Sequence, residues 1–377
     1  MKIGIIKEKK PDEKRVALSP DIVRQLVKKG YQVMVEKEAG DLSYFSNADY
    51  VSAGADVFDT WNEVCKNCDV LLKVNAVLLE EVDEMKELGI TISLLYAHTQ
   101  PELVKKLNSK KISAFAMDAV PRISRAQKMD ALSSQANLAG YKAVIMGANQ
   151  MGKIFPLMMT AAGTIVPSKV LIFGAGVAGL QAVATAKRLG AVVEVTDLRF
   201  ETKEQVESLG GKFIMVEGMD KIVTKGGYTV EVPKEILDRQ QILIKDKIKD
   251  ADLVITTALV MGKKAPILVT DEMVNSMKHG AVIVDMALEA GGNCELSEKN
   301  KTVVKHGVTI IGEANIPSLL PVNASQLYAV NISTLLMHLS THEKFKWELD
   351  EEITAGCLIT HHGELIHANT IKIIQNN

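Results

Sequence analysis

The sequence predicts an α/β protein of two domains, each built on a parallel sheet with helices on its faces. The chain has 377 residues, whereas one hydrophobic core rarely serves more than about 250 to 300 residues. Short runs rich in β-branched residues alternate with stretches of helical periodicity, which is typical of βα units. Apolar residues make up 47% and charged residues 24%, so disordered and fibrous classes are excluded.

The first series of βα units lies towards the N-terminus. Amphipathic stretches such as PDIVRQLVKKG (20–30) and PELVKKLNSKK (101–111) have the apolar spacing of helices. The runs between them are short, apolar and bounded by polar residues, so we expect them to be strands. These runs are KIGIIKE (2–8), YQVMVE (31–36), DVLLKV (69–74), TISLLYA (91–97) and ISAFAM (112–117).

A second series with the same alternation follows, and the length of the chain favours a separate sheet for it. Its expected strands are KVLIFGAG (169–176), VVEVTDL (192–198), KFIMV (212–216), DLVITTA (252–258), AVIVDMA (281–287) and VTIIGEAN (308–315).

Helical stretches rather than flexible linkers join the two series. Within residues 122–155, small or apolar residues recur at helical spacing, and Asp130 or Ser133 is a candidate cap for the helix start. Residues 323–345 are again helical and would return the chain to the first domain. We therefore expect a discontinuous first domain of residues 1–130 plus 325–377 and a second domain of residues 131–324, joined by long crossing helices around a cleft.

Composition and charge exclude several classes of partner. Lys plus Arg number 44 and Asp plus Glu 46, giving a net charge of −2, so no overall field favours nucleic acid. The longest mainly apolar stretch, 170–186, is shorter and more polar than the ~20 apolar residues of a membrane span. The N-terminus lacks the apolar run of a secretory signal. These features predict a cytosolic or similarly reducing compartment, with no direct membrane span.

No metal site is expected. The pair Cys65 and Cys68 lacks a second pair with zinc-ligand spacing, and we expect reduced cysteines at a helix end. His338 and His342 lack the glutamate of H-E-x-x-H, so we expect an incidental surface pair.

The strongest local motif is KVLIFGAGVAGLQA, which contains G-x-G-x-x-G directly after an expected strand and at the start of a helix. The first glycine permits a tight turn, the second lets backbone approach a pyrophosphate, and the third lets the helix pack on the strand. The helix N-terminus then offers N–H groups to the phosphates, so a nearly neutral protein can bind them. The motif comprises Gly174, Gly176, Val177, Ala178 and Gly179.

Acidic and basic residues end the next expected strand. Asp197, 23 positions after Gly174, is placed to accept hydrogen bonds from an adenosine ribose, which favours NAD over NADP. After Leu198 comes Arg199, which can accommodate a 2′-phosphate. We expect Arg199 instead to be a solvated residue that opens the next helix.

Later segments are expected to line the same cleft, because ligands bind outside the carboxyl ends of parallel strands. Thr257, Ala258 and Leu259 end the expected strand 252–258 and follow it. Tyr228 lies in KGGYTVEVPKEI, whose two glycines are compatible with a lid or with a surface loop.

These residues resemble the NAD(H)-binding component, domain I, of the proton-translocating nicotinamide nucleotide transhydrogenases, which is related to alanine dehydrogenase. The resemblance covers essentially the whole chain and is most specific at RISRAQKMDALSSQANLAGY, GAGVAGLQA, VITTAL, GGNCE and SQLYAVN. It implies that Arg122, Gln127, Asp130 and Ser133 surround the nicotinamide. Orientation of carboxamide and ribose suits direct hydride transfer, which needs no general base.

The resemblance also implies the setting of the reaction. The chain would bind NAD(H) and exchange hydride, Si-specifically, between NADH and NADP⁺, with NADP(H) held on a partner domain III. A membrane domain II would couple the exchange to proton translocation. The chain would be a homodimer, mainly through its second domain, bound peripherally at the cytoplasmic or a matrix-like face of the membrane, and nearly inactive alone.

Alanine dehydrogenase is the alternative function. Arg15 and Lys73 match its two cationic positions, but its catalytic histidine aligns with Tyr96 and its catalytic aspartate with Glu289. Neither residue replaces the original group chemically, because tyrosine titrates near 10 and glutamate is longer. His98, two positions after Tyr96 on an expected strand, would face the same side and keeps the alternative open. We expect Arg15 and Lys73 to form surface or inter-strand salt bridges.

Overall fold

The computed structural model describes residues 1–221, 224–225, 228–229, 233–259 and 264–375. The chain divides into two compact units. The first comprises Met1–Gln135 and Pro317–Asn377, and the second comprises Ala136–Ile316. Each unit has an α/β fold with a largely parallel sheet, as the sequence predicts. The expected domain boundaries, after residues 130 and 324, lie within several residues of these divisions.

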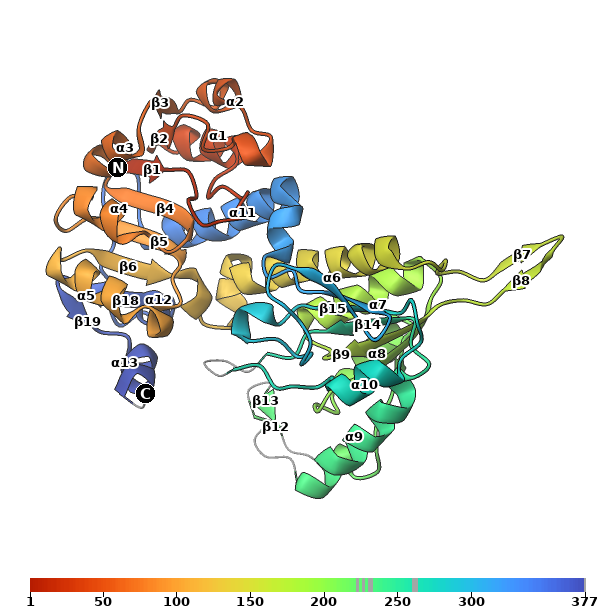
Figure 1. Ribbon diagram of the computed structural model, residues 1–377. Helices are drawn as coiled ribbons and strands as arrows, with labels where there is room; N and C mark the ends of the chain where they lie inside the picture. Colours follow the sequence, from red (N-terminus) through yellow and green to blue (C-terminus); the bar gives the residue numbers. More distant parts are fainter. Residues whose placement is uncertain (222–223, 226–227, 230–232, 260–263, 376–377) are drawn as a thin grey trace. The chain divides into compact units, whose positions relative to one another are not determined.

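The first unit contains an eight-stranded sheet in the order β19-β18-β6-β5-β4-β1-β2-β3 (Figure 1). From β3 to β6 all neighbours are parallel. The strand order reverses between β1 and β4, as in dinucleotide-binding sheets. The antiparallel edge strands β18 and β19 were not predicted. The strands are β1 (Lys2–Ile5), β2 (Gln32–Glu36), β3 (Asp56–Phe58), β4 (Val70–Asn75), β5 (Ile90–Leu94), β6 (Ser113–Ala116), β18 (Leu358–His361) and β19 (Glu364–Leu365).

Helices cover both faces of this sheet. One buried cluster joins the strands to α1, α2, α11 and α12, and another joins them to α3, α4 and α5. Proline occupies a first-turn position of α1, α5 and α11, where its missing N–H removes no helical bond. The helices are α1 (Pro20–Lys28), α2 (Asn47–Ser52), α3 (Trp61–Asn67), α4 (Leu79–Glu84), α5 (Pro101–Ser109), α11 (Pro321–Leu339), α12 (Glu352–Cys357) and α13 (Ala368–Gln375).

The second unit has a seven-stranded sheet in the order β11-β10-β9-β14-β15-β17-β16. All neighbours are parallel except β16, which pairs antiparallel with β17. The strand order reverses between β9 and β14, so the loops after these two strands are adjacent. The strands are β9 (Lys169–Phe173), β10 (Val192–Thr196), β11 (Lys212–Phe213), β14 (Leu253–Thr256), β15 (Val282–Asp285), β16 (Thr302–Lys305) and β17 (Val308–Ile311).

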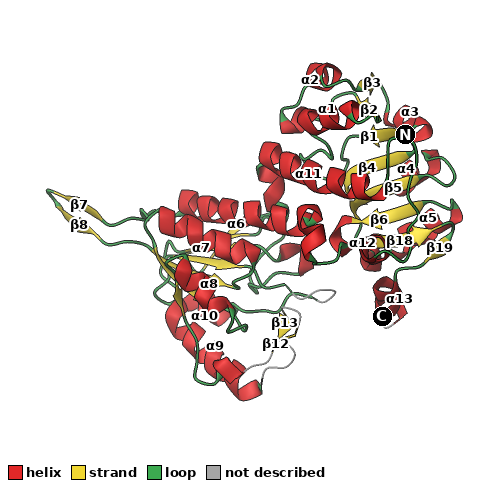
Figure 2. Cartoon of the chain, turned by 180° about the vertical axis from the view of Figure 1, so that it is seen from behind, coloured by secondary structure: helices red, strands yellow, loops and turns green. Residues whose placement is uncertain are grey.

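Helices cover both faces of the second sheet as well (Figure 2). Residues of α6, α7 and α8 share one buried cluster with the strands, and residues of α9 and α10 share the other. A Cβ on Gly140 of α6 would lie 2.1 Å from the Ala178 carbonyl oxygen, so glycine permits the close approach of α6 to α7. The helices are α6 (Ala131–Gln150), which begins in the first unit, α7 (Val177–Arg188), α8 (Thr202–Ser208), α9 (Lys234–Ile248) and α10 (Asp271–Ser276).

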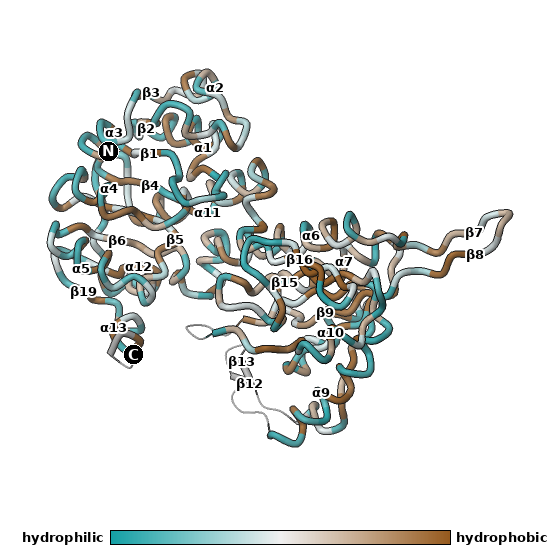
Figure 3. Tube along the Cα trace, viewed as in Figure 1, coloured by the Kyte–Doolittle hydropathy of each residue, from teal (hydrophilic) through white to brown (hydrophobic). Residues whose placement is uncertain are grey.

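Two short hairpins belong to the second unit. One pairs β7 (Met158–Thr160) with β8 (Gly163–Ile165), and all residues of both strands are exposed. This hairpin projects beyond the rest of its unit, and β8 (GTI) is hydrophobic only towards its end, at Ile165 (Figures 1 and 3). The other hairpin pairs β12 (Thr224–Lys225) with β13 (Tyr228–Thr229). Neither was predicted from the sequence.

Across the described ranges, none of the helices combines the length and apolar character that crossing a bilayer requires. The same ranges contain no group of three or more histidine, cysteine, aspartate or glutamate side chains suited to hold a metal ion.

Candidate functional site

The glycine motif forms an open backbone cradle after β9. Gly174 has a φ of +99°, which favours glycine, and its N–H donates to the Thr196 carbonyl oxygen at 2.8 Å. A Cβ on Gly179 would lie 1.9 Å from the Gly174 oxygen, so α7 can pack against the loop only with glycine there. A Cβ on Gly176 would meet nothing closer than Arg199 Nη2 at 3.9 Å. The loop therefore leaves free the space that the second glycine opens for a pyrophosphate.

The loop after β14 lies beside this cradle. The Thr257 N–H and Oγ1 donate to the Phe173 carbonyl oxygen at 2.9 and 3.0 Å, which ties the two loops together at the reversal of strand order. Ala258 is half-buried and Leu259 is exposed, as is Val177 at the start of α7. The second unit thus brings together the glycine loop and the 257–259 segment, as expected for a ligand site at the carboxyl ends of parallel strands.

Asp197 lies at the end of β10 and is nearly buried. Its Oδ2 accepts the Ala175 N–H at 2.7 Å, and its Oδ1 accepts the Arg199 N–H at 2.8 Å. The Arg199 guanidinium forms a bidentate pair with the same carboxylate: Nε donates to Oδ1 at 2.9 Å, and Nη2 donates to Oδ2 at 2.7 Å. The expectation that Arg199 is merely solvated is therefore wrong. A two-residue spacing lets the fork close on the carboxylate that precedes it.

Two predicted residues of this unit add little to that geometry. Leu198, between the pair, is half-buried. Tyr228 begins β13, but its side chain lies outside the described residues.

The predicted nicotinamide residues lie in the first unit, on the 3₁₀ segment η4 (Ser124–Met129) and around it. Ala126 and Met129 are three residues apart and buried, which is one turn of a 3₁₀ helix, so Gln127 faces solvent. Arg122, just before η4, is exposed as well. The side chains of Arg122 and Gln127 form no hydrogen bond or ion pair within the described ranges, and both are therefore accessible to a ligand.

Asp130 and Ser133 together start helix α6. The Ser133 N–H donates to Asp130 Oδ1 at 2.8 Å, and the Ser133 hydroxyl donates to Asp130 Oδ2 at 2.6 Å. Asp130 therefore caps the helix and also orients the Ser133 side chain. The neighbouring residues Lys128 and Ser134 are both bonded to the Asn331 side chain of α11. The Asn331 amide donates to the Lys128 carbonyl oxygen at 2.9 Å and accepts a hydrogen bond from the Ser134 hydroxyl at 2.7 Å. These contacts fix η4 and the start of α6 against α11.

Arg15 and Lys73 form salt bridges, as expected, but the expectation that these bridges lie on the surface or between strands is wrong, because both side chains are buried. The Arg15 Nε and Nη2 donate to Glu13 at 2.7 Å each, and Nη1 donates to Gln135 Oε1 at 2.9 Å. The Lys73 Nζ pairs with Glu81 at 2.7 Å, and both side chains are at most 1% exposed. Each cation is thus neutralised by a carboxylate of its own unit, because a buried charge requires a partner.

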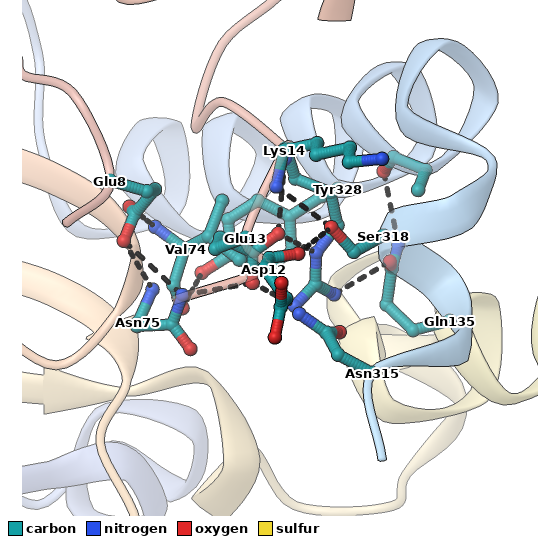
Figure 4. A network of polar contacts seen from close by, with 12 residues as sticks. Glu8, Asp12, Glu13, Lys14, Val74, Asn75, Gln135, Asn315, Ser318 and Tyr328 are labelled. Atoms are coloured by element: carbon teal, nitrogen blue, oxygen red, sulfur yellow. Dashed lines mark hydrogen bonds and ion pairs between the residues drawn. The ribbon is translucent and has the colours of Figure 1, made fainter. Parts of the chain in front are cut away.

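A network of polar contacts lies at the ends of β1 and β4, where the strand order of the first sheet reverses (Figure 4). Glu8, after β1, accepts the Val74 N–H at 2.6 Å, and Glu13 accepts the Asn75 side chain at 3.0 Å. The Tyr328 hydroxyl donates to the Lys73 carbonyl oxygen at 2.8 Å. The place where the second unit has a glycine cradle is therefore occupied in the first unit by the protein's own side chains.

The Glu13–Arg15 pair predicts acid-sensitive stability. Although burial acts to raise the pKa of Glu13, the charge and hydrogen bonds of Arg15 lower it from 4.5 to about 2. A carboxyl with a lowered folded-state pKa stabilises the fold above its unfolded pKa and loses that stabilisation as the pH falls from 4.5 towards 2. The shift corresponds to about 3 kcal/mol. Urea unfolding of Glu13→Gln should show lower stability at pH 7 and a shallower loss in this window than the unsubstituted protein. The exposed Glu348→Gln is the control, and an unchanged slope in Glu13→Gln would contradict the assignment.

The residues aligned with alanine dehydrogenase chemistry are not arranged as expected. Strand β5 ends at Leu94, and Tyr96 has a φ of +45°, so the expectation that His98 continues the strand is wrong. His98 lies instead on the 3₁₀ turn η2 (Ala97–Thr99). Glu289 is exposed on the 3₁₀ turn η6 (Leu288–Ala290) of the second unit.

Cys65, Cys68 and His338 are in contact with the protein itself, in environments that suit a structural role. Cys65 and Cys68 are free and buried at the end of α3. Burial raises the pKa of the Cys68 thiol to about 12, which opposes thiolate chemistry. His338 pairs with Glu351 at 3.0 Å.

Sequence reasoning expects segment 284–295 to line the cleft, but it did not single out two buried residues of this segment. Asp285 ends β15, and Asn293 follows in the GGNCE motif; both are 0% exposed. The available signal was an acidic strand end followed by two glycines and an asparagine, a pattern that places a polar side chain beside a tight turn.

Family models match nearly the whole chain. The N-terminal domain of alanine dehydrogenase/PNT matches residues 4–139, and the C-terminal domain of alanine dehydrogenase/PNT matches residues 143–368. Residues 317–368 fall within the second model although they fold with the first unit.

Individual relatives give the same result. One relative is the first part of NAD(P) transhydrogenase subunit alpha from Rhodospirillum rubrum. It is 48% identical, over 97% of this chain and 98% of that protein. An alanine dehydrogenase of Staphylococcus saprophyticus is 32% identical, over 99% of this chain and 97% of that protein. The crystal structure of transhydrogenase from Sinorhizobium meliloti superposes with a TM-score of 0.86 at 40% identity, and covers 98% of this chain and 100% of that one.

Proposed function

Because the chain belongs to the alanine dehydrogenase/PNT family, and its similarity to transhydrogenase alpha subunits exceeds its similarity to alanine dehydrogenase, we propose that it is the NAD(H)-binding component of a proton-translocating NAD(P) transhydrogenase. The observation that carries the proposal is the cradle formed by Gly174, Gly176 and Gly179 at the reversal of strand order in the second sheet.

The residues of the second unit fit a dinucleotide. A Cβ on Gly176 would enter open space, while Cβ atoms on Gly174 and Gly179 would clash within the protein. The N-terminus of the twelve-residue helix α7 directs N–H groups towards that space. Asp197 lies at the strand end where an adenosine ribose is held in this fold. When bound, NADH supplies the hydride that is exchanged with NADP⁺.

The residues of the first unit suit orientation. We assign Arg122, Gln127, Asp130 and Ser133 to the nicotinamide end. The exposed Gln127 and Arg122 can donate to a carboxamide, and the Asp130–Ser133 pair presents a hydroxyl held by a fixed carboxylate. None of these groups is a general base, and direct hydride transfer between nicotinamides requires none.

Gln127→Asn should slow hydride exchange without weakening NADH binding. The shorter side chain still hydrogen-bonds but no longer reaches the same point, so exchange should fall about tenfold while the NADH dissociation constant stays within about twofold. Stopped-flow exchange and fluorescence titration measure the two quantities. Arg125→Ala, an exposed position on the same segment, is the control. A raised dissociation constant with unchanged exchange would assign Gln127 to binding instead.

Alanine dehydrogenase activity is the competing function, supported by 32% identity to one such enzyme. The positions of its catalytic histidine and aspartate are Tyr96 and Glu289, and the cations Arg15 and Lys73 are already paired with Glu13 and Glu81. An external carboxylate would have to displace these partners. We therefore expect the protein not to oxidise NADH in the presence of pyruvate and ammonia; turnover in this assay would establish the competing function.

The partners follow from the same proposal. NADP(H) binds to a domain III on another polypeptide or segment, a membrane domain II carries the protons, and the transfer is Si-specific. The chain is peripheral on the cytoplasmic or matrix-like face of the membrane, held there by these partners, and nearly inactive without them. The Rhodospirillum rubrum relative is named as one portion of an alpha subunit, which supports a division of the enzyme among several polypeptides.

A homodimer completes the proposal, and the β7–β8 hairpin supports it. Met159 is 78% and Val166 63% exposed, and apolar surface of this kind is typical of an interface. Light scattering at micromolar concentration should give a dimer, and Met159→Glu combined with Val166→Glu should shift it towards monomer. The control is Leu42→Glu, at an exposed apolar residue of the first unit. A monomeric unsubstituted protein would exclude the dimer.

A further inference from the structure

Two buried polar residues outside the predicted site, Asp285 and Asn293, connect the loops after β14 and β15. Both are fully buried, so their charge or amide must be satisfied by the protein. Their hydrogen bonds lead from the core of the second unit to the segment that carries Thr257 and Ala258. The inference rests on the proposed function of this segment and the glycine loop as a dinucleotide site.

The Asp285 carboxylate accepts hydrogen bonds from several residues of the loop that follows β15. Its Oδ1 accepts the Thr256 hydroxyl at 3.1 Å and the Ala287 N–H at 3.0 Å. Its Oδ2 accepts the N–H groups of Asn293 and Cys294 at 2.9 Å each. These four donors are uncharged, and each compensates part of the cost of burying the carboxylate.

Two glycines make this arrangement possible. Gly291 and Gly292 have φ values of +103° and +86°, a region that favours glycine. A Cβ on Gly292 would lie 2.9 Å from Asp285 Oδ2. The chain can therefore fold back over the carboxylate only with glycine at this position, and the turn delivers Asn293 to its buried site.

The Asn293 side chain holds one residue of the neighbouring loop from both sides. Its Oδ1 accepts the Ala258 N–H at 3.0 Å, and its Nδ2 donates to the Ala258 carbonyl oxygen at 2.9 Å. The same Nδ2 donates to the Pro266 carbonyl oxygen at 2.8 Å. Both amide hydrogens and the amide oxygen are thus used, which fixes the Ala258 peptide groups in position and orientation.

Ala258 directly follows Thr257, which fixes the glycine loop. The Thr257 hydroxyl donates to the Phe173 carbonyl oxygen. The same hydroxyl oxygen would lie 2.5 Å from a Cβ on Gly174, so it is close to the glycine loop. A shift of Ala258 therefore moves Thr257 against Gly174. We propose that Asp285 and Asn293 are positioning residues of the dinucleotide site, which hold segment 257–259 and, through Thr257, the glycine loop in the shape that accepts the nucleotide.

The test is a comparison of NADH affinity and stability in the full chain. Asn293→Ala leaves both Ala258 groups without their partner, and the NADH dissociation constant should rise about tenfold, equivalent to about 1.4 kcal/mol. Ser168→Ala removes a buried hydroxyl that donates to the Ile154 carbonyl oxygen, directly before β9 and so at the opposite end of the strands from this loop. It should lower the melting temperature without changing the dissociation constant. An Asn293→Ala protein that melts earlier but binds NADH as tightly as the unsubstituted protein would overturn the proposal.

A double-mutant cycle tests the route through Thr257. If Asn293 acts through this residue, Thr257→Val combined with Asn293→Ala should weaken NADH binding little more than the stronger single variant does. A dissociation constant raised by the product of the two single effects would show independent action and overturn the route. If the Asn293 variants do not fold, hydrogen exchange in the unsubstituted protein decides: NADH should slow exchange of the Ala258 amide, and unchanged exchange would refute the proposal. Failure of the unsubstituted protein to bind NADH would instead refute the proposed function.

Discussion

Gly176→Ala is expected to fold normally and to lose NADH binding. The new Cβ would have Arg199 Nη2, 3.9 Å away, as its nearest neighbour in the protein, so the melting temperature should stay within a few degrees. The same methyl group would occupy the space through which a pyrophosphate approaches the backbone. Loss of the charge-assisted hydrogen bonds there should raise the NADH dissociation constant about a hundredfold, equivalent to about 2.8 kcal/mol.

Two other glycines provide matched controls for this result. Gly179→Ala would place a Cβ 1.9 Å from the Gly174 carbonyl oxygen, so this variant should be strongly destabilised before any question of binding arises. Gly152→Ala meets nothing within 4 Å and should leave both stability and affinity unchanged. Calorimetry and fluorescence titration on the three proteins separate the effects. Unchanged NADH affinity in Gly176→Ala would mean that the dinucleotide does not contact this loop.

Asp197→Ala is expected to weaken NADH binding and to improve NADPH binding. The substitution removes the acceptor for a ribose hydroxyl and for the Ala175 N–H, and it leaves the Arg199 guanidinium without its counter-charge. NADH affinity should fall about tenfold, or about 1.4 kcal/mol. The released guanidinium can then pair with a 2′-phosphate, so NADPH affinity should rise. The ratio of NADPH affinity to NADH affinity should therefore increase by more than the roughly tenfold change that weaker NADH binding alone would give.

The double variant Asp197→Ala with Arg199→Ala identifies the source of that change. Without the guanidinium, NADH binding should remain weak and the gain for NADPH should disappear. Titration with both nucleotides at one salt concentration measures the ratio, because the phosphate contact is sensitive to screening. A gain for NADPH that persists in the double variant would exclude Arg199 as its cause, and unchanged NADH affinity in the single variant would show that the ribose is held elsewhere.

Periodicity and local motifs were sufficient to predict the fold class, most strands and the glycine loop. The G-x-G-x-x-G residues lie between β9 and α7, and Thr257 follows the neighbouring strand, because the order of parallel strands fixes which loops meet. The edge strands β18 and β19 escaped prediction, and the turn between them lies at His362 and Gly363, which both have positive φ. Their short runs pair only after the chain returns from the second unit.

The side-chain environments could not be predicted, because they depend on contacts between distant residues. Arg15 is buried against Gln135, 120 positions away, and the Lys73 carbonyl oxygen accepts a bond from Tyr328, 255 positions away. Nothing in the local sequence distinguishes such a buried cation from a surface one. The left-handed backbone of Tyr96 likewise ends β5 early and displaces His98 from the expected face. Arg199 was misjudged for a different reason, since its partner Asp197 was already assigned to a ligand.

The central claim is that this chain presents NAD(H) for direct hydride exchange with NADP(H) on a partner. The most direct measurement mixes the purified chain with an NADP(H)-binding domain III and follows the transfer of deuterium from labelled NADH to NADP⁺. We predict transfer of the label without exchange into solvent, and none when either protein is omitted. A domain III that exchanges hydride with the Rhodospirillum rubrum relative but not with this chain would contradict the account.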